Sequence, residues 1–147
     1  MIPFFSSSAK ETHAIGIHIA KALFEKRVVA LFGDLGAGKT TFVRGFAEGV
    51  MGKKAQMVCS PTFNYLNIYQ GKRVLYHFDL YRLPNEREFL IAGFEEMLGE
   101  ELCCIEWPER IPTLLPKDAV RIRFAHQGKT KREIRVENLA SVVAFNV

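Results

Sequence analysis

One eight-residue motif restricts the folds open to this chain more than any other feature of its sequence. Residues 33–40 read Gly-Asp-Leu-Gly-Ala-Gly-Lys-Thr, which matches the phosphate-loop pattern G-x-x-x-x-G-K-[ST] in full. In such a loop the glycines let the backbone curl, so that successive N–H groups and the start of the next helix face a polyphosphate. We therefore expect Lys39 to reach the β- and γ-phosphates and the Thr40 hydroxyl to bind Mg²⁺.

The segments on both sides of the motif fit the strand and the helix that such a loop connects. Residues 28–32 are a short β-branched apolar run of buried-strand length. After the loop, Phe42, Phe46 and Val50 recur at helical spacing until Gly52 interrupts the pattern. The sequence therefore predicts a nucleotide-binding loop, with these candidate residues: Gly33, Asp34, Leu35, Gly36, Ala37, Gly38, Lys39, Thr40 and Thr41.

The composition is ordinary for a globular protein and excludes several classes. The 147 residues are 48% hydrophobic and 24% charged, which favours a single domain over 1–147. The net charge of +4 permits a nucleic-acid or acidic partner without requiring one. No run approaches the ~18 apolar residues of a membrane span, and the first residues lack the basic start and apolar core of a signal peptide. We therefore expect a cytoplasmic protein with no membrane partner.

The remaining segments alternate between helical and strand-like patterns. In order, we expect a helix opened by a Ser8–Glu11 capping box, the strand 28–32, the loop helix, the hairpin strands 63–69 and 73–79, a helical stretch 86–97 interrupted near Gly93, the strand 102–105, and the hairpin strands 119–124 and 132–136. This order predicts an α/β fold. It is a three-layer domain of the P-loop NTPase type with a mixed parallel/antiparallel sheet. The apolar tail from about residue 138 has no assignment.

Two carboxylates follow predicted buried strands. Asp79 ends an apolar run as a Walker-B aspartate does, where it would hold Mg²⁺ directly or through water. Glu106 ends the strand 102–105, so its carboxylate should emerge at the ligand-binding edge of the sheet. It is the candidate to orient or deprotonate an attacking water, and the alternative is a solvated glutamate at a strand end. The candidate metal residues are Thr40, Asp79 and Glu106.

Two further residues are candidates on weaker signals. Thr62 lies in a polar turn after the loop helix, where a switch threonine could sense the γ-phosphate through Mg²⁺, although the turn alone is not specific. Trp107, the one tryptophan, directly follows Glu106. It could pack on a neighbouring helix, or it could stack on a base or a partner surface.

Four motifs in this order make the chain resemble a known family. They are Gly-Asp-Leu-Gly-Ala-Gly-Lys-Thr-Thr (33–41), Ser-Pro-Thr-Phe (60–63), His-Phe-Asp-Leu-Tyr-Arg (77–82) and Glu-Trp-Pro-Glu (106–109). Over roughly residues 9–125 the chain resembles the TsaE (YjeE) family of small bacterial ATPases. The resemblance implies a role in forming the threonylcarbamoyl group on N6 of adenosine 37 in tRNAs that read ANN codons.

The resemblance also implies partners and residue roles. A TsaE protein is not the transferase; it binds a TsaD–TsaB heterodimer and hydrolyses ATP, which resets the complex between turnovers. By motif, Lys39 and the 33–41 backbone hold phosphates, while Thr40 and Asp79 serve Mg²⁺. Thr62 resembles the switch threonine, Glu106 the catalytic carboxylate and Trp107 the partner- or RNA-facing aromatic residue. Contact with tRNA would be indirect or transient.

Other functions remain open on the residues alone. A small kinase would use the same loop, but it needs an arginine-bearing lid and an acceptor pocket, and the segment 82–87 is short for a lid. A nucleotide-regulated RNA-binding module would use the last hairpin. There Arg121 and Arg123 fall on one face of their strand, as do Lys131 and Arg135 on theirs. Glu133 interrupts that basic stripe, which also fits a solvated face. The lack of an Asn-Lys-x-Asp guanine reader favours ATP over GTP.

Overall fold

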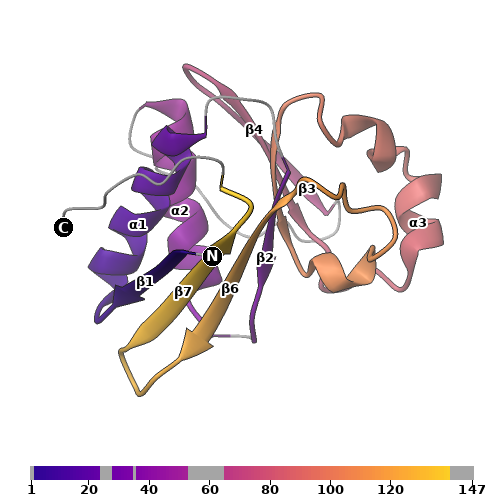
Figure 1. The fold of residues 1–147 in the computed structure, drawn as a ribbon. Helices are drawn as coiled ribbons and strands as arrows, with labels where there is room; N and C mark the ends of the chain where they lie inside the picture. Colours follow the sequence, from indigo (N-terminus) through magenta and orange to yellow (C-terminus); the bar gives the residue numbers. More distant parts are fainter. Residues whose placement is uncertain (1, 24–27, 35, 53–64, 140–147) are drawn as a thin grey trace.

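The computed structural model describes residues 2–23, 28–34, 36–52 and 65–139 (Figure 1). Its elements are β1 (Ile2–Ser6), α1 (Ala9–Ala22), β2 (Val28–Phe32), α2 (Lys39–Met51), β3 (Leu66–Gln70), β4 (Val74–Asp79), α3 (Glu86–Ile91), the 3₁₀ turn η1 (Phe94–Met97), β5 (Leu102–Glu106), the 3₁₀ turn η2 (Pro108–Arg110), β6 (Val120–His126) and β7 (Arg132–Glu137). No helix among the described residues is long and apolar enough to cross a bilayer.

The strands form a seven-stranded mixed sheet in the order β1-β7-β6-β2-β5-β4-β3. The four central strands, β6, β2, β5 and β4, run parallel, and β7, β1 and β3 add antiparallel neighbours at the two sides. The predicted mixed sheet is therefore confirmed. Because the carboxyl ends of the parallel strands meet at one edge, β2, β4 and β5 deliver the residues that follow them to the same place.

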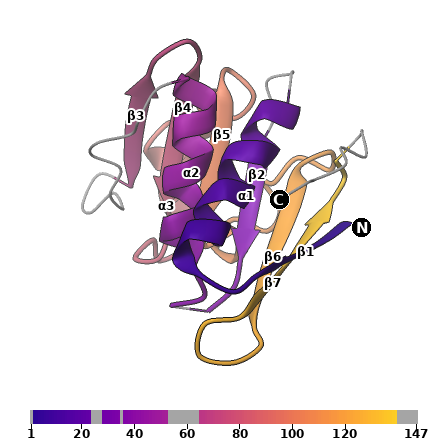
Figure 2. The same cartoon turned by 90° about the vertical axis from the view of Figure 1, so that its left-hand side faces the viewer.

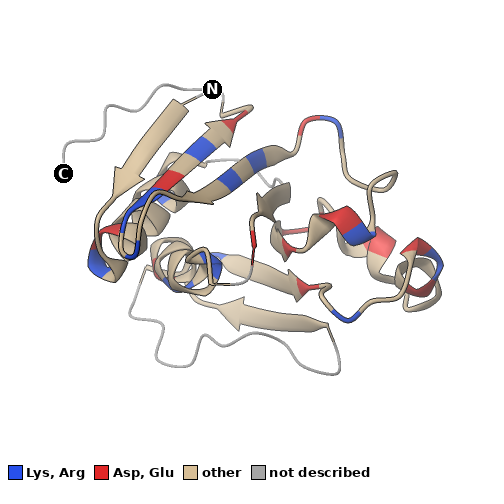
Figure 3. Cartoon of the chain, turned by 90° about the horizontal axis from the view of Figure 1, so that it is seen from below, with Lys and Arg blue, Asp and Glu red and all other residues tan. Residues whose placement is uncertain are grey.

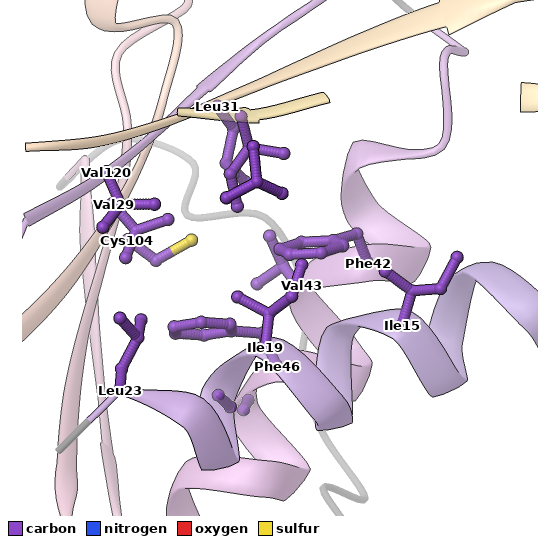
Figure 4. Packing of buried hydrophobic residues seen from close by; sticks show 14 of the residues in the cluster. Ile15, Ile19, Leu23, Val29, Leu31, Phe42, Val43, Phe46, Cys104 and Val120 are labelled. Carbon is purple, nitrogen blue, oxygen red and sulfur yellow. The ribbon is translucent and has the colours of Figure 1, made fainter. Parts of the chain in front are cut away.

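Helices cover both faces of this sheet. Helices α1 and α2 lie on one face, and α3 with the two 3₁₀ turns lies on the other (Figures 1 and 2). The core under α1 and α2 is built from apolar side chains of those helices and of the sheet, such as Ile19, Phe46 and Cys104 (Figure 4). A second buried cluster, including Phe78 and Phe89, fills the space between the sheet and α3. The three predicted layers are confirmed.

Local signals place most of the element boundaries. The Ser8 hydroxyl accepts a hydrogen bond from the Glu11 N–H at 3.1 Å, as a capping box requires, although the Glu11 carboxylate accepts from the N–H of Ser7 and not from that of Ser8. Gly52 ends α2 in the left-handed conformation at φ 73°. The stretch 86–97 divides at Gly93 into α3 and η1.

Strand β1 was absent from the predicted order. Its Pro3 cannot donate to a sheet ladder, and a proline normally argues against a strand. The structure accommodates it because β1 is an edge strand: within the described part of the chain it pairs with β7 alone and lies at one end of the sheet order. The first two residues of the predicted strand 63–69 lie outside the described residues.

Candidate nucleotide-binding site

The phosphate loop connects the end of β2 to the start of α2, as the motif predicts. Gly36 and Gly38 have φ values of 78° and 99°, a left-handed region that favours glycine, so the loop can curl only because both positions lack a side chain. The Ala37 N–H donates to the Asp34 carbonyl oxygen at 3.1 Å and tightens the turn. The first backbone N–H groups of α2 have no acceptor within the helix, which leaves them free to donate to an anion. Leu35 lies outside the described residues.

Lys39 is buried within the loop, with 5% of its surface exposed. Its Nζ donates to the Gly33 carbonyl oxygen at 2.6 Å and lies 3.9 Å from the centroid of the Trp107 ring. Burial lowers the pKa of this ammonium, while neighbouring carboxylates, that of Glu106 foremost, act in the opposite direction. This buried ammonium contacts one carbonyl oxygen and one aromatic ring, so a charge-assisted hydrogen bond to a phosphate oxygen would stabilise it further.

The structure brings the loop and the strand-end carboxylates together. Asp79 of β4 and Glu106 of β5 are directly paired in the parallel register, and Glu106 is also paired with Leu31 of β2, just before the loop. Asp79, Glu106 and the loop border one pocket of about 340 Å³. Its lining residues are Gly36, Gly38, Lys39, Thr40, Thr41, Asp79, Tyr81, Glu106, Trp107 and Arg132.

The carboxylate pair fits a divalent cation of the Mg²⁺ kind. Burial, with a smaller effect of Glu106, raises the pKa of Asp79, although the Tyr81 N–H donates to its Oδ1 at 3.1 Å. A cation would stabilise the Asp79 carboxylate, whose charge is disfavoured by burial and by Glu106. Among the described residues, no group of three or more His, Cys, Asp or Glu side chains could hold a metal ion. Mg²⁺ suits such a site, because it is usually bound by one or two carboxylates together with phosphate oxygens and waters.

Glu106 is buried to 3% exposure, unlike a solvated glutamate at a strand end. Its Oε2 lies 2.7 Å from Nε2 of His77, a β4 residue that is itself 1% exposed. The Glu106 backbone carbonyl accepts from the Leu80 N–H at 3.1 Å, which ties the end of β5 to the segment after β4. Burial and the contact with His77 hold the Glu106 carboxylate in one orientation, as a group that accepts a proton from a substrate requires.

Trp107 contacts the loop lysine, a contact that neither sequence interpretation anticipated. Its φ of 59° places a non-glycine residue in the left-handed region directly after β5. The ring contacts both the Lys39 ammonium and the Tyr81 ring, with 4.9 Å between the two ring centroids. Trp107 therefore borders the pocket beside Lys39.

Two functional candidates were missed by the sequence interpretation. Arg132, at the start of β7, borders the pocket; its Nη2 donates to the Gly36 carbonyl oxygen at 3.4 Å, and its buried Nε has no hydrogen-bond partner among the described residues. No local pattern marks it, because it reaches the loop through the pairing of β2 with β6 and of β6 with β7. His77 did carry a signal: a polar residue inside an apolar strand, on the same face as Asp79.

Two other predictions have different outcomes. Thr62 lies outside the described residues, and its switch role stays a prediction.

On the last hairpin, Arg123 pairs with Glu137 at 3.3 Å, and Arg135 pairs with Glu133. Residues 120–137 nevertheless carry six basic side chains against Glu133 and Glu137, a net charge of +4, and both blue and red bands mark this hairpin in Figure 3. A solvated face and a phosphate-binding stripe are both compatible with this charge.

A phosphate loop between a central parallel strand and a helix, with carboxylates ending two neighbouring strands, defines a protein of the P-loop NTPase class. The family model described as "Threonylcarbamoyl adenosine biosynthesis protein TsaE" matches residues 6–134. The chain belongs to the TsaE family.

Individual relatives agree with this assignment. The chain is 41% identical over 132 residues to the tRNA threonylcarbamoyladenosine biosynthesis protein TsaE of Treponema pallidum (strain Nichols), covering 89% of this chain and 96% of that one. It is also 41% identical to the protein of the same name from Bacillus subtilis (strain 168), covering 85% and 78%. The solved structure titled "Crystal structure of Bacillus subtilus YdiB" superposes with a TM-score of 0.75 at 34% identity, covering 90% and 82%.

Proposed function

We propose that this protein is a Mg²⁺-dependent ATP hydrolase that supports threonylcarbamoyladenosine formation in tRNA, in complex with a TsaD–TsaB heterodimer. The observation that carries the hydrolase assignment is the register pairing of Asp79 with Glu106 beside the buried Lys39. The pathway assignment rests on family membership and on the name that its relatives share. The partner follows from the resemblance of the motifs, and the cytoplasmic location follows from the composition and from the role in tRNA modification.

The loop side of the pocket would bind the triphosphate. Backbone N–H groups at the start of α2 would donate to phosphate oxygens, and Lys39 would exchange its Gly33 carbonyl for β- and γ-phosphate oxygens. Arg132 adds a second cation within reach of the loop. Thr40 and Asp79 would hold Mg²⁺, with Glu106 adjacent. When bound, this ion neutralises charge on the phosphates and fixes their orientation.

Glu106 would act on the attacking water. Its carboxylate would accept a proton while the water oxygen bonds to the γ-phosphorus and the bond from that phosphorus to the bridging oxygen of ADP breaks. The products are ADP and inorganic phosphate. Burial of Glu106 at 3% exposure keeps bulk water from competing for the proton, so a single water can be positioned.

The partner would complete the site. Positioning and electrostatic stabilisation supply nearly all the catalysis in phosphoryl transfer, and a missing element supplied from outside can raise the rate by roughly 10³–10⁵. We therefore expect slow hydrolysis by the protein alone and faster hydrolysis on TsaD–TsaB. Trp107 borders the pocket and would be the aromatic residue that senses docking. A kinase is the weaker candidate, because the segment 82–87 remains too short for an arginine lid.

Phosphate release from ATP tests this function, with and without Mg²⁺ and with and without TsaD–TsaB. We expect Mg²⁺-dependent hydrolysis that Glu106→Gln lowers by roughly 10²-fold or more, with ATP affinity by calorimetry nearly unchanged. Lys39→Ala should abolish ATP binding. The matched control, Glu96→Gln, changes an exposed glutamate of η1 and should behave as the unsubstituted protein. Normal stimulated hydrolysis by Glu106→Gln would overturn the assignment of the base.

A further inference from the structure

A chain of hydrogen bonds crosses three strands and ends at Glu106. The Asn67 amide Nδ2 lies 3.4 Å from the Tyr69 hydroxyl, which lies 3.3 Å from His77 Nδ1, and His77 Nε2 lies 2.7 Å from Glu106 Oε2. Asn67 and Tyr69 belong to β3, His77 to β4 and Glu106 to β5. The chain therefore runs from the edge strand of the sheet to the pocket.

The chemistry of these groups fixes the direction of the chain. An ionised Glu106 can only accept, so His77 Nε2 must carry the hydrogen and donate. A neutral imidazole then accepts at Nδ1, where the Tyr69 hydroxyl is placed to donate. Tyr69 also stacks on the imidazole, with 6.0 Å between ring centroids and 29° between ring planes. Glu106 thus selects the tautomer, and Tyr69 complements it at Nδ1 and stacks on the ring plane.

Packing alone does not explain why a histidine occupies position 77. It is 1% exposed and lies in β4 on the face that carries the apolar core under α2, where a leucine would need no hydrogen-bond partner. Its place two residues before Asp79 puts both side chains on the same side of β4, below the pocket. Its one carboxylate partner is the residue proposed as the base.

We propose that His77 is a positioning residue for Glu106, and that Tyr69 orients His77. This inference rests on the proposed hydrolase function. The imidazole holds one carboxylate oxygen, Oε2, so the other oxygen, Oε1, is the one that acts on the water.

Three variants separate positioning from scaffolding. His77→Phe keeps an aromatic ring and removes both hydrogen bonds. His77→Gln keeps an N–H donor that can reach Glu106, and Tyr69→Phe removes only the hydroxyl that orients the ring. The matched control is Tyr76→Phe on β4, whose hydroxyl bonds Glu100 on the other side of the sheet. Each variant is measured for kcat and KM of Mg²⁺-ATP hydrolysis, for ATP affinity by calorimetry, and for thermal stability.

We expect His77→Phe to lower kcat by about 10- to 100-fold, the usual effect of removing a residue that orients a site ligand. ATP affinity should change little. His77→Gln should recover most of the lost rate, and Tyr69→Phe should lie between the two. In the Glu106→Gln background, His77→Phe should cause no further loss, because the histidine acts only through Glu106.

Equal losses for His77→Phe and His77→Gln, or a full additive loss in the Glu106→Gln background, would overturn the inference. So would an unchanged kcat in His77→Phe. If His77→Phe does not fold, Tyr69→Phe decides: a kcat equal to that of Tyr76→Phe overturns the inference. Absence of Mg²⁺-ATP hydrolysis in the unsubstituted protein would instead refute the proposed function, so the two failures are distinguishable.

Discussion

At the scale of single residues, the pocket holds charges in surroundings that disfavour them. Burial lowers the pKa of Lys39 and raises the pKa of Asp79, so the charged form of each group is less stable in the pocket than in water. Such opposed shifts in one pocket are typical of functional sites, where stability is given up for ligand binding. Bound Mg²⁺ and phosphates would satisfy both groups.

Asp79→Asn should reveal this cost as a pH-dependent gain in stability. The folded-state pKa of Asp79 is raised above its ordinary 3.8, so the folded state holds the proton more tightly than the unfolded state. The free energy of unfolding therefore falls as pH rises from about 3.8 through the folded pKa, and it stays lowered above that. The variant lacks this loss and keeps the acceptor for the Tyr81 N–H.

Urea unfolding without nucleotide at several pH values checks this prediction. Above the folded pKa the variant should be at least as stable as the unsubstituted protein, and the gap should close as pH approaches 4. Glu96→Gln serves as the exposed control, with no such trend. A variant that is less stable at neutral pH, or a gap that does not depend on pH, would contradict the account.

The sequence identifies residues of this site when one local pattern carries them. Lys39 is named by its motif, and Asp79 and Glu106 are named by the strands they end, because strand ends of an α/β sheet share one edge. The place of Arg132 depends on the pairing of β2 with β6, and the bond from His77 to Glu106 depends on the pairing of β4 with β5; both join segments distant in the sequence. The stacking of Trp107 on Lys39 depends on a left-handed backbone that no local pattern predicts.

At the scale of elements, the phosphate loop depends on how closely α2 approaches α1. The two helices touch backbone to backbone: a Cβ atom added at Gly45 would lie 2.0 Å from the His13 carbonyl oxygen, and one added at Gly16 would lie 2.4 Å from that of Phe42. Only glycine permits this approach. Because α2 begins at the loop lysine, the contact between the helices also fixes the start of the loop helix.

Gly45→Ala should therefore destabilise the protein, although alanine is the better helix former by about 0.5–1 kcal/mol. Overpacking of this kind costs about 1–3 kcal/mol, and the atoms that must move are backbone atoms of α1. Arg44→Ala, the neighbouring exposed position, is the control and should change the free energy of unfolding by less than about 0.5 kcal/mol. Chemical denaturation measures both. Equal stability of the two variants would contradict the close contact.

The type of an element could be predicted wherever the sequence shows a clear hydrophobic periodicity or a capping residue. The Ser8 cap, the apolar run of β2 and the helical stripe of α2 each matched the structure because local and tertiary preferences agree there. Strand β1 was missed because its pairing with β7 overrides the signal of Pro3. Propensity fails at such edges, where tertiary pairing decides.

At the scale of the whole molecule, one sheet edge carries the proposed chemistry. The parallel centre of the sheet places the phosphate loop, Asp79 and Glu106 side by side, and the β6–β7 hairpin brings Arg132 to the same pocket. Helices α1 and α2 support one face of the sheet and α3 the other (Figure 2). The arrangement leaves the pocket bordered by Trp107 and Tyr81, where a partner could complete the site.

Multiple-turnover formation of threonylcarbamoyladenosine in tRNA tests the central claim most directly. The measurement counts modified tRNA per TsaD–TsaB heterodimer in the presence of this protein, Mg²⁺ and ATP. If hydrolysis at this pocket resets the complex, the unsubstituted protein should support many turnovers. Glu106→Gln, which should bind ATP without hydrolysing it, should hold the reaction near one turnover. Equal multiple-turnover yields with the unsubstituted protein and with Glu106→Gln would contradict the account.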